Sequence, residues 1–499
     1  MDADLIVIGA GFGGLGAALT AADSGAKVLL LEALSYPGGC ASTFGKAGYR
    51  FDAGATLVSG LGPGQLFDRW ARRHGLPIAV RPLDPVVELR APGLRLALPP
   101  SREGLVATLL AAGCEEAPLR RFFAVQAAVA DALWPTLDDP GRLPPFDLPG
   151  LIFTLKAAPK LLPALRWAGR PLGAVLRATG AEGQAPLRLL LDALCQITVQ
   201  ARAEEAEAPL ALSALDYLAR GAAHVEGGVG ALAEALAGAV EARGGALRRA
   251  SRARGLRRAG GAWLVEARGE VHRAPVVLAN LLPQDLAALR GEGPPTGAQA
   301  RLSSRVEAGW GAVMLYLAVG DHEGLPAHAA HLELVEDPAL PFVEGAHVFC
   351  SLSGRGEVGR APEGQRVITV STHILAERLR GQPPAAQAAL VQGVQDRMRA
   401  LIAARAPELL AGGLRYDAPG SPRTFQRFTR RAGGLVGGVP RAAGWGHYRD
   451  LLPTAAGPGL WLVGDSVFPG QSALAAALGG ARTARAALGR GPARRLLRG

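Results

Sequence analysis

The sequence has few cysteines, few aromatic residues and almost no lysine. Its four cysteines are scattered and none stands in a C-x-x-C pair, which argues against a disulfide framework or a zinc site and favours a reducing compartment. Four lysines stand against fifty arginines, and aromatic residues make up 5% of the chain. Because no basic block is interleaved with aromatic residues, we interpret the net charge of +11 as arginines spread over a solvated surface and expect no nucleic-acid binding.

Long uncharged runs are also scarce, and the one near the start has its own explanation. Residues 5–22 are uncharged and long enough for a membrane span or a signal segment. Acidic residues precede this run instead of basic ones, and it contains five glycines. We therefore expect neither a signal peptide nor a spanning helix, and a cytoplasmic protein that can rest on the inner face of the cell membrane.

The rest of the composition is that of a globular protein. Hydrophobic residues make up 49% and charged residues 19% of the 499 positions, which excludes a disordered chain. A chain of this length favours at least two domains.

The first residues match a dinucleotide-binding βαβ unit. The apolar run 5–8 predicts a buried parallel strand, and residues 9–14 follow it with the pattern G-x-G-x-x-G. Such glycines permit a tight turn, close approach of the backbone to a pyrophosphate and close packing of the next helix, which we expect to run to residue 22. The residues assigned to the cofactor here are Gly9, Gly11, Phe12, Gly13 and Gly14.

A second strand is expected at residues 27–31, and Glu32 ends it about twenty residues after the glycines. An acid at this position accepts hydrogen bonds from the ribose hydroxyls and disfavours a 2′-phosphate. We assign Glu32 and the adjacent Ala33 to the cofactor site. This unit by itself does not distinguish FAD from NAD.

Three further segments bear on that choice. Residues 37–54 contain Pro-Gly-Gly and end with Phe-Asp-Ala-Gly. Residues 225–256 open with a glycine-rich turn, which predicts a helix to residue 242 and then a return to the dinucleotide unit, and residues 275–280 predict another buried strand. Residues 461–488 predict a short strand, then Gly-Asp-Ser and Phe-Pro-Gly-Gln, and then an alanine-rich helix. No second glycine fingerprint with a downstream acid occurs, which favours a bound FAD without a separate NAD(P)H domain.

Together these segments resemble the carotenoid desaturase and isomerase branch of the FAD-dependent amine oxidase superfamily, with retinol saturase a near relative. The most specific piece is 464–471, Gly-Asp-Ser-Val-Phe-Pro-Gly-Gln, and residues 424–438 match the family's glycine-rich approach to the flavin. The resemblance implies an α/β protein in which a Rossmann-type FAD domain of the glutathione reductase kind is interleaved with a substrate domain of mixed sheet and helices. We expect the cofactor domain at 1–100, 221–290 and 421–499 and the substrate domain at 101–220 and 291–420.

The resemblance also implies cofactor contacts outside the first unit. Asp465 is expected to bind the ribityl chain or a phosphate, and the backbone of Ala253 to pair with the adenine. The helix that begins at Ser472 is expected to direct its dipole at the flavin. The positions assigned on this ground are Gly38, Gly39, Asp52, Gly54, Ala253, Gly464, Asp465, Gln471 and Ser472.

The implied reaction is a carotenoid desaturation: a hydride leaves an allylic carbon for flavin N5, and a proton is lost from the neighbouring carbon. A late 3,4-desaturation is the first expectation, and a polyene isomerase, which uses reduced flavin without net oxidation, or a retinol-saturase-like enzyme is the alternative. Ser472 stands where isomerases commonly have glycine, so the branch stays open. No catalytic acid or base is assigned, because His224 and His447 are each interpreted as surface or capping residues.

Two other functions are less favoured. Cys40 stands where amine oxidases usually have arginine, which argues against an amine oxidase. A non-enzymatic isoprenoid-binding protein such as the Rab GDP-dissociation inhibitors would not need Glu32, Asp465 and the full glycine set.

The middle of the chain contains a basic amphipathic stretch at residues 151–177. Apolar residues alternate there with lysines and arginines, and prolines break the stretch into short pieces. Such a stretch can lie on an anionic membrane face, where a polyisoprenoid would be collected, or form a helical lid with a solvated basic face. The sequence indicates no oligomeric state.

Overall fold

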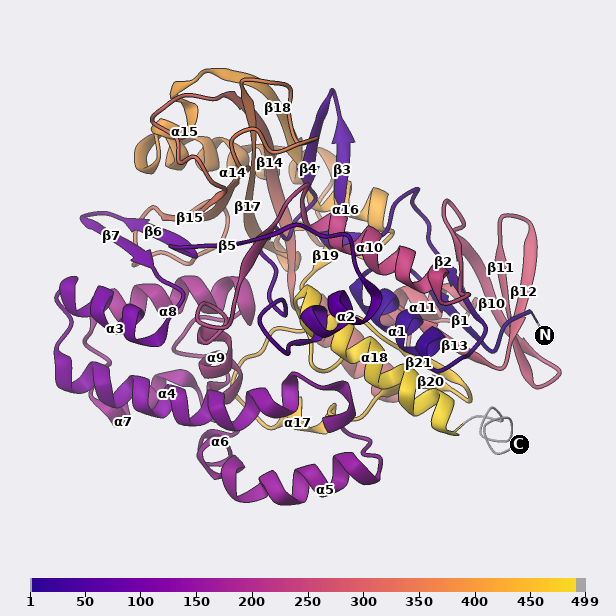
Figure 1. Ribbon diagram of the computed structural model, residues 1–499. Helices are drawn as coiled ribbons and strands as arrows, with labels where there is room; N and C mark the ends of the chain where they lie inside the picture. The colour runs from indigo at the N-terminus through magenta and orange to yellow at the C-terminus, as the bar shows by residue number, and fades with distance from the viewer. Residues whose placement is uncertain (1, 491–499) are drawn as a thin grey trace.

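The molecule has two large sheets, and the first is a six-stranded sheet built from both ends and the middle of the chain (Figure 1). The computed structural model describes residues 2–490. Four of the five strand pairs in this sheet are parallel, and β1 lies between β13 and β2. In order across the sheet, the strands are β20 (Thr454–Gly457), β21 (Leu460–Leu462), β13 (Val276–Ala279), β1 (Leu5–Ile8), β2 (Val28–Leu31) and β9 (Ala246–Arg248).

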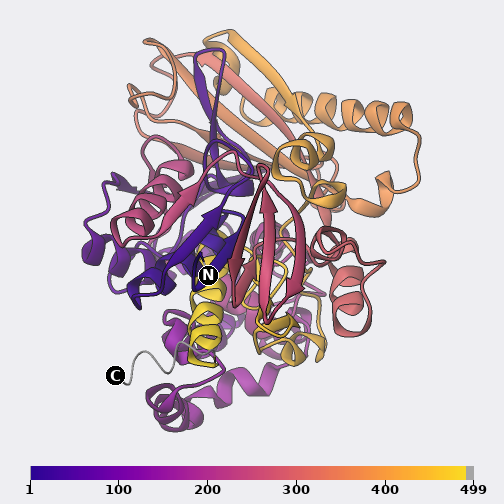
Figure 2. The same cartoon turned by 90° about the vertical axis from the view of Figure 1, so that its right-hand side faces the viewer.

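Both faces of this sheet are covered, which is why its central strands are apolar throughout. Three alanine- and glycine-rich helices pack on one face: α1 (Phe12–Asp23), α10 (Val229–Ala242) and α18 (Ala473–Arg490). The other face contacts a three-stranded antiparallel sheet of β10 (Ala253–Ala259), β11 (Ala262–Ala267) and β12 (Glu270–Ala274), seen beside β1 in Figure 2. The uncharged run at residues 5–22 thus forms β1 and most of α1 inside this core, as the dinucleotide pattern predicts.

The second large sheet has eight strands, and almost all of its strand pairs are antiparallel. One face packs on α14 (Pro384–Arg405), and the other faces a layer of helices. The path runs through β18 (Leu414–Gly420), β14 (Trp310–Gly320), β17 (Gln365–Leu375), β16 (His347–Leu352), β15 (Ala330–Val335), β6 (Val87–Ala91) and β7 (Leu94–Leu98), and β19 (Leu435–Val436) pairs with β14.

The helical layer lies on the far side of this sheet from α14 (Figure 1). Its apolar residues form one large core with the sheet face that they cover. The elements are α3 (Arg102–Ala111), α4 (Glu116–Leu137), η2 (Pro140–Arg142), α5 (Leu148–Ala157), η3 (Ala158–Leu161), α6 (Leu162–Trp167), α7 (Leu172–Thr179), α8 (Ala185–Thr198) and α9 (Ala208–Leu215).

Short elements connect these layers. Two of them are two-stranded sheets, β3 (Thr43–Lys46) with β4 (Tyr49–Asp52) and β5 (Val80–Pro82) with β8 (Ala223–Val225). The others are η1 (Gly39–Ala41), α2 (Leu66–His74), α11 (Pro283–Leu289), α12 (Gly297–Glu307), α13 (Ala376–Leu379), α15 (Glu408–Ala411), α16 (Pro422–Thr429), η4 (Ala432–Gly434) and α17 (Gly446–Arg449).

The first expected domain boundary, at residue 100, is wrong. Strands β6 and β7 precede it but belong to the eight-stranded sheet, because β6 pairs in parallel with β15. That pairing joins residues almost 250 positions apart in the chain, such as Glu88 and Leu332, so local patterns did not indicate it.

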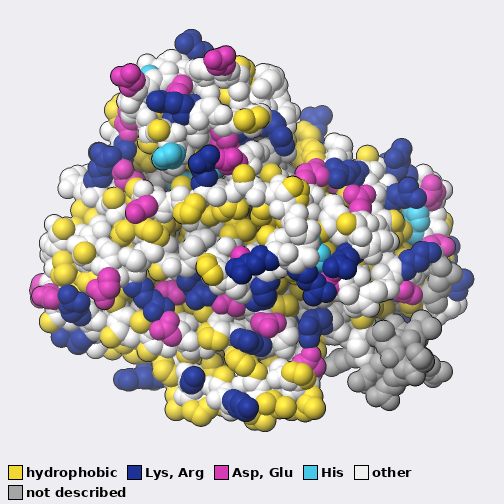
Figure 3. Space-filling model, in the orientation of Figure 1, with side chains coloured by type: hydrophobic (Ala, Val, Ile, Leu, Met, Phe, Trp, Pro, Cys, Tyr) yellow, Lys and Arg dark blue, Asp and Glu magenta, His cyan; other side chains and the backbone are white. Residues whose placement is uncertain are grey.

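One helical segment lies on the surface with an apolar face exposed. Residues 148–167 are long and apolar enough to cross a membrane by length and composition, with a mean hydropathy of 1.2, and 11% of the segment is buried. The short turn η3 divides it into α5 and α6. Figure 3 shows yellow hydrophobic side chains at the lower edge of the molecule with dark blue basic side chains among them, where Figure 1 places α5. Its exposed apolar side chains include Leu148, Leu151, Ile152, Leu155, Leu162 and Leu165.

Candidate functional site

The glycine loop after β1 is packed so closely that side chains have no room. A Cβ atom on Gly13 would lie 2.7 Å from the Cα of Gly464, and one on Gly14 would lie 1.9 Å from the carbonyl oxygen of Gly9. Gly9 and Gly464 also have φ angles of +92° and +108°, in the region that favours glycine. The loop and the C-terminal Gly-Asp segment therefore meet at the carboxyl edge of the six-stranded sheet, where ligands bind in sheets of this kind.

Asn280 lies at the centre of this meeting point, although the sequence analysis did not assign it to the site. Its Nδ2 donates to the carbonyl oxygen of Gly9 at 3.4 Å, and a Cβ on Gly11 would lie 2.7 Å from the same nitrogen. Asn280 directly follows β13, so the polar end of that predicted strand was the available signal.

Glu32 lies beside the loop at the end of β2. Its two carboxylate oxygens accept from the backbone N–H groups of Ala10 at 2.7 Å and Leu34 at 2.8 Å. Burial raises the pKa of this carboxyl, and these backbone donors oppose the rise. Each carboxylate oxygen keeps a further lone pair, so Glu32 can still accept hydrogen bonds from ribose hydroxyls.

Two other predicted contacts lie next to these groups. The N–H of Gly38 donates to the carbonyl oxygen of Ala10 at 2.8 Å, and Gly38 and Gly39 have φ angles of +111° and +60°. The N–H of Ser251 donates to the carbonyl oxygen of Glu32 at 2.6 Å, two residues before Ala253 begins β10. The structure thus brings Gly38, Gly39 and Ala253 close to the first βαβ unit, and their cofactor contacts stay predictions.

Asp465 is held by an arginine that sequence reasoning missed. Arg431 donates from both terminal nitrogens to the Asp465 carboxylate at 3.0–3.1 Å, and its Nε donates to the carbonyl oxygen of Leu435 at 2.6 Å. Cys40 lies nearby, and burial raises the pKa of its thiol while Arg431 opposes the rise. The Arg431–Asp465 pair therefore gives the end of β21 an ordered charged group beside the glycine loop.

The C-terminal helix begins as predicted, but a second glutamine holds its start. Ser472 has a φ of +95°, and its Oγ accepts from the N–H of Ala475 at 3.1 Å. Gln471 accepts from Nε2 of Gln200 at 2.8 Å and donates to the carbonyl oxygen of Ile197. These bonds tie the loop before α18 to the end of α8 in the helical layer.

The carboxylate of Asp52 has structural partners for both oxygens. One oxygen accepts from the hydroxyl of Thr43 at 2.6 Å and from the N–H of Val229 at 2.9 Å, and the other accepts from Arg360 at 2.9 Å. Asp52 therefore joins β4 to the N-terminus of α10 and to the loop before β17. Its assignment to the cofactor stays a prediction, as does that of Gly54.

The interpretation of two histidines as surface or capping residues is wrong. His224 is 4% exposed and lies 3.0 Å from a carboxylate oxygen of Glu357, and His447 is 9% exposed and contacts Arg305 and Arg441. Burial and the neighbouring arginines lower the pKa of His447 to about 4. Their partners lie far away in sequence or on other elements, so neighbouring residues gave no signal of burial.

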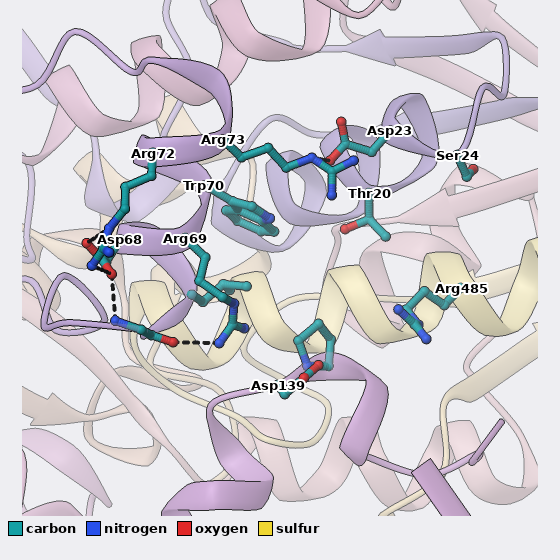
Figure 4. A pocket seen from close by; sticks show the side chains of 13 residues that line it. Thr20, Asp23, Ser24, Asp68, Arg69, Trp70, Arg72, Arg73, Asp139 and Arg485 are labelled. Carbon is teal, nitrogen blue, oxygen red and sulfur yellow. Dashed lines mark hydrogen bonds and ion pairs between the residues drawn. The ribbon is translucent and has the colours of Figure 1, made fainter. Parts of the chain in front are cut away.

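Two cavities lie outside the glycine-loop site. One, of about 750 Å³, is bounded by α1, α2, α18 and η2 (Figure 4), at the end of α1 opposite the glycine loop. Its arginines are engaged: Arg72 with Asp68, and Arg69 with the carbonyl oxygens of Gly64 and Asp138. The other, of about 660 Å³, lies between α14 and α16. The larger cavity is therefore separate from the dinucleotide site.

The residues at the glycine loop fit a dinucleotide. Because Gly11, Gly13 and Gly14 have no side chains, the backbone N–H groups at the start of α1 are accessible to a phosphate. The positive end of the α1 helix dipole lies at the same place. Glu32 lies at the end of β2, about twenty residues after the glycines, where an acid binds the ribose hydroxyls of a dinucleotide.

Comparisons with known proteins give a family match to the N-terminal unit and relatives of nearly full length. The family of NAD(P)-binding Rossmann-like domains matches residues 7–73. The chain is 26% identical to the chloroplastic prolycopene isomerase of Arabidopsis thaliana over 96% of this chain and 81% of that protein. It is 29% identical to the hydroxyneurosporene desaturase of Cereibacter sphaeroides over 97% of each chain.

Among solved structures, a putrescine oxidase with bound putrescine has the same fold. Its TM-score is 0.60 at 15% sequence identity, and the match covers 98% of this chain and all of that one. The chain therefore combines a Rossmann-type domain with mixed sheets in the same overall fold as that structure.

Proposed function

We propose that the chain binds FAD and desaturates a long polyene, because it is similar over nearly its full length to a prolycopene isomerase and a hydroxyneurosporene desaturase. A late 3,4-desaturation is the specific reaction proposed. The observation that carries the proposal is the convergence of the glycine loop, Glu32, Asn280 and the Arg431–Asp465 pair on one edge of the six-stranded sheet.

These residues would hold the cofactor in an extended form. Glu32 and the backbone near Ala253 would bind its adenosine, and the start of α1 its pyrophosphate. Gly464, Asp465 and the N-terminus of α18 would bind the ribityl and flavin portion. When bound, FAD supplies the acceptor for a hydride from the polyene.

The protein residues have a positioning task. Conjugation stabilises the positive charge that develops on an allylic carbon, so the reaction mainly requires that the polyene lie flat beside the cofactor with water excluded. We place the reacting end of the polyene next to the apolar core between the eight-stranded sheet and the helical layer, which would supply such an environment. No charged group needs to stabilise the reacting carbon directly.

An isomerase is the second candidate, since the chain matches the plant prolycopene isomerase over nearly its full length. A retinol-saturase-like reaction would use the same scaffold. Both differ from the desaturase in the direction or absence of net electron transfer.

We also propose that the chain rests on an anionic membrane through the surface of α5 and α6. Seven of the fourteen exposed large hydrophobic side chains among the described residues lie between positions 146 and 165. Lys156, Lys160 and Arg166 are interspersed with them, as in helices that lie in the interface. Trp445, which is 63% exposed, packs beside Gly169 next to this surface. A peripheral position would let the polyene pass from the bilayer into the core under the helical layer.

The test begins with protein purified in mild detergent or with liposomes. Its absorption spectrum is recorded under anaerobic conditions before and after addition of lycopene or of a hydroxylated acyclic carotenoid, and the pigments are extracted. Bleaching of oxidised flavin together with a red-shifted product would support the desaturase. A geometric change of the pigment that requires pre-reduced flavin would support the isomerase.

A variant without a phosphate site provides the control. Gly11→Val adds atoms where a Cβ alone would approach Asn280 within 2.7 Å, so this variant should retain no flavin and produce no pigment change. If the unsubstituted chain retains no flavin either, the proposal of FAD-dependent chemistry is overturned.

A further inference from the structure

A buried polar cluster lies where the eight-stranded sheet faces the helical layer. It is centred on His331 in β15 and on Ser351, which lies opposite in β16. Alternate residues of a strand point to opposite faces of the sheet. Leu332 packs into the core beneath α14, whereas Val335 and Phe349, on the same face as His331, contact the core of the helical layer.

Hydrogen bonds connect His331 to the segment that approaches the cofactor site. Its Nδ1 lies 2.8 Å from Oγ of Ser351, which lies 2.5 Å from Oγ1 of Thr56. All three side chains are at most 7% exposed. Thr56 follows Gly54 by two residues, and Gly54 is one of the positions that the family resemblance assigns to the cofactor. The cluster is therefore next to the expected reaction site.

A second imidazole faces the first. The ring of His224 lies 6.0 Å from that of His331, measured between centroids, and its Nε2 lies 3.0 Å from an oxygen of Glu357. Glu357 also accepts from the N–H groups of Gly227 and Gly354 at 2.7 and 2.8 Å. These bonds hold His224 in place and leave its other nitrogen for another partner.

Each ring has one nitrogen without a hydrogen bond. Within residues 2–490, neither Nε2 of His331 nor Nδ1 of His224 has a protein partner, although the two side chains are only 3% and 4% exposed. Buried polar atoms in folded proteins are nearly always paired, and leaving one unpaired destabilises the fold. Two such atoms on neighbouring rings indicate a place where a polar group of a ligand is bound.

The state of His331 favours an uncharged ligand group. Burial, together with His224, lowers the pKa of His331 to about 3, while Glu357 opposes the shift. The ring is therefore neutral at physiological pH, with one nitrogen that donates and one that accepts. Such a weak base is poorly suited to remove a proton, but it can bind a hydroxyl, which both donates and accepts.

We propose that His224 and His331 form a recognition site for a hydroxyl group of the polyene substrate. This inference rests on the proposed function and narrows its substrate class to polyenes with a hydroxyl near the end that enters the reaction site. A polyene without that hydroxyl would leave the two nitrogens unpaired, and sites of this kind discriminate strongly against such analogues.

The test compares two polyenes on the holoprotein in mixed micelles. Dissociation constants for lycopene and for monohydroxylated lycopene are measured by quenching of tryptophan fluorescence. The unsubstituted protein should bind the hydroxylated polyene at least about tenfold more tightly. His331→Leu should remove this preference, and His331→Gln, which keeps a polar group near the position of Nε2, should retain part of it.

His347→Leu is the matched control. His347 is 2% exposed and lies on the same sheet face. Its Nε2 also has no hydrogen bond to residues 2–490, but it lies 3.6 Å from a carboxylate oxygen of Glu333, and the ring stacks on Phe342. This variant should keep the preference. Equal affinities of the unsubstituted protein for the two polyenes, or loss of the preference in His347→Leu as well, would overturn the inference while leaving the proposed function intact. A protein that binds neither polyene would instead contradict the proposed function.

Discussion

The two large sheets of the molecule carry their polar side chains in different places. In the six-stranded sheet, the strands β1, β2 and β13 are apolar and buried throughout, and Glu32 and Asn280 come directly after strand ends. In the eight-stranded sheet, His331, Glu333 and Ser351 lie within strands and on one face. The first sheet is covered by apolar layers on both faces, so only its edge is available for polar groups.

This difference corresponds to the different ligands that the two sheets would bind, a dinucleotide and a long polyene. Phosphates and ribose hydroxyls are bound by backbone groups and a few side chains at the carboxyl edge of a parallel sheet. A long polyene needs an extended apolar surface, which the face of an antiparallel sheet can supply with single polar groups at chosen positions. Four predictions test this division, beginning with the largest expected effect.

The first concerns Asp52, which joins the two regions. Asp52→Ala should lower the free energy of unfolding by about 3 kcal/mol or more, because Arg360 would be left as a buried charge with a weaker partner. Asp131→Ala, which removes a 64%-exposed partner of Arg102, should cost less than about 1 kcal/mol. Urea unfolding followed by circular dichroism gives both values. Similar losses in the two variants would mean that the Asp52 bridge is not a structural link.

The second concerns close packing in the cofactor region. Gly14→Ala should lower the free energy of unfolding by about 3 kcal/mol and abolish flavin retention, because its Cβ would overlap the carbonyl oxygen of Gly9. Gly238→Ala, in an exposed part of α10 with open space around it, should be neutral or should stabilise the protein by up to about 1 kcal/mol. Flavin content and thermal unfolding of both variants are measured together. A Gly14→Ala protein with full flavin content would contradict the packing argument.

The third concerns the surface of the helical layer. Changing Leu148, Leu155 and Leu162 to serine should weaken binding to vesicles with anionic phospholipids about a hundredfold, with little change in stability, because these side chains are 64–71% exposed. Co-sedimentation with vesicles measures the binding, and added salt should weaken it further. Leu414→Ser, at a 50%-exposed position on β18, is the control and should bind as before. Unchanged binding of the triple variant would favour a helical lid over a membrane surface.

The fourth concerns the pH dependence of the polar sheet face. The pKa of His331 is lowered to about 3 in the fold, so between about pH 6.5 and 3 the unfolded chain binds one more proton at this residue. Its contribution to stability is therefore present above pH 6.5 and is lost progressively as the pH falls. His331→Leu should reduce the slope of unfolding free energy against pH between 5 and 6 by about 1 kcal/mol per unit. An unchanged slope in His331→Leu would contradict this assignment.

Sequence reasoning predicted the parts of the fold that depend on neighbouring residues. Three of the predicted features are local patterns: the glycine spacing, the acid after the second strand and the C-terminal Gly-Asp turn. Each can be interpreted from the geometry of a strand and the turn that follows it. The structure brings these segments together at one edge, with Gly13 against Gly464 and Glu32 beside Ala10. Asn280 was missed because one polar residue after a strand is a weak signal.

Other features depended on contacts that only the tertiary structure creates. The bonds between Asp52 and Arg360 and between Thr56 and Ser351 join residues 308 and 295 positions apart. From the number and spread of the arginines, we expected them on a solvated surface. Four of them are buried instead: Arg360, Arg366, Arg441 and Arg482.

The sequence by itself therefore determined the dinucleotide unit, because a phosphate site is built from a short stretch of backbone whose shape depends on glycine. It did not determine which side chains lie between the eight-stranded sheet and the helical layer. Whether His331 faces an apolar core or water depends on strand pairing and on the helical layer, and both are set by residues far away along the chain. Only folding brings those residues together and buries a nitrogen of His331 that has no hydrogen-bond partner in the described part of the chain.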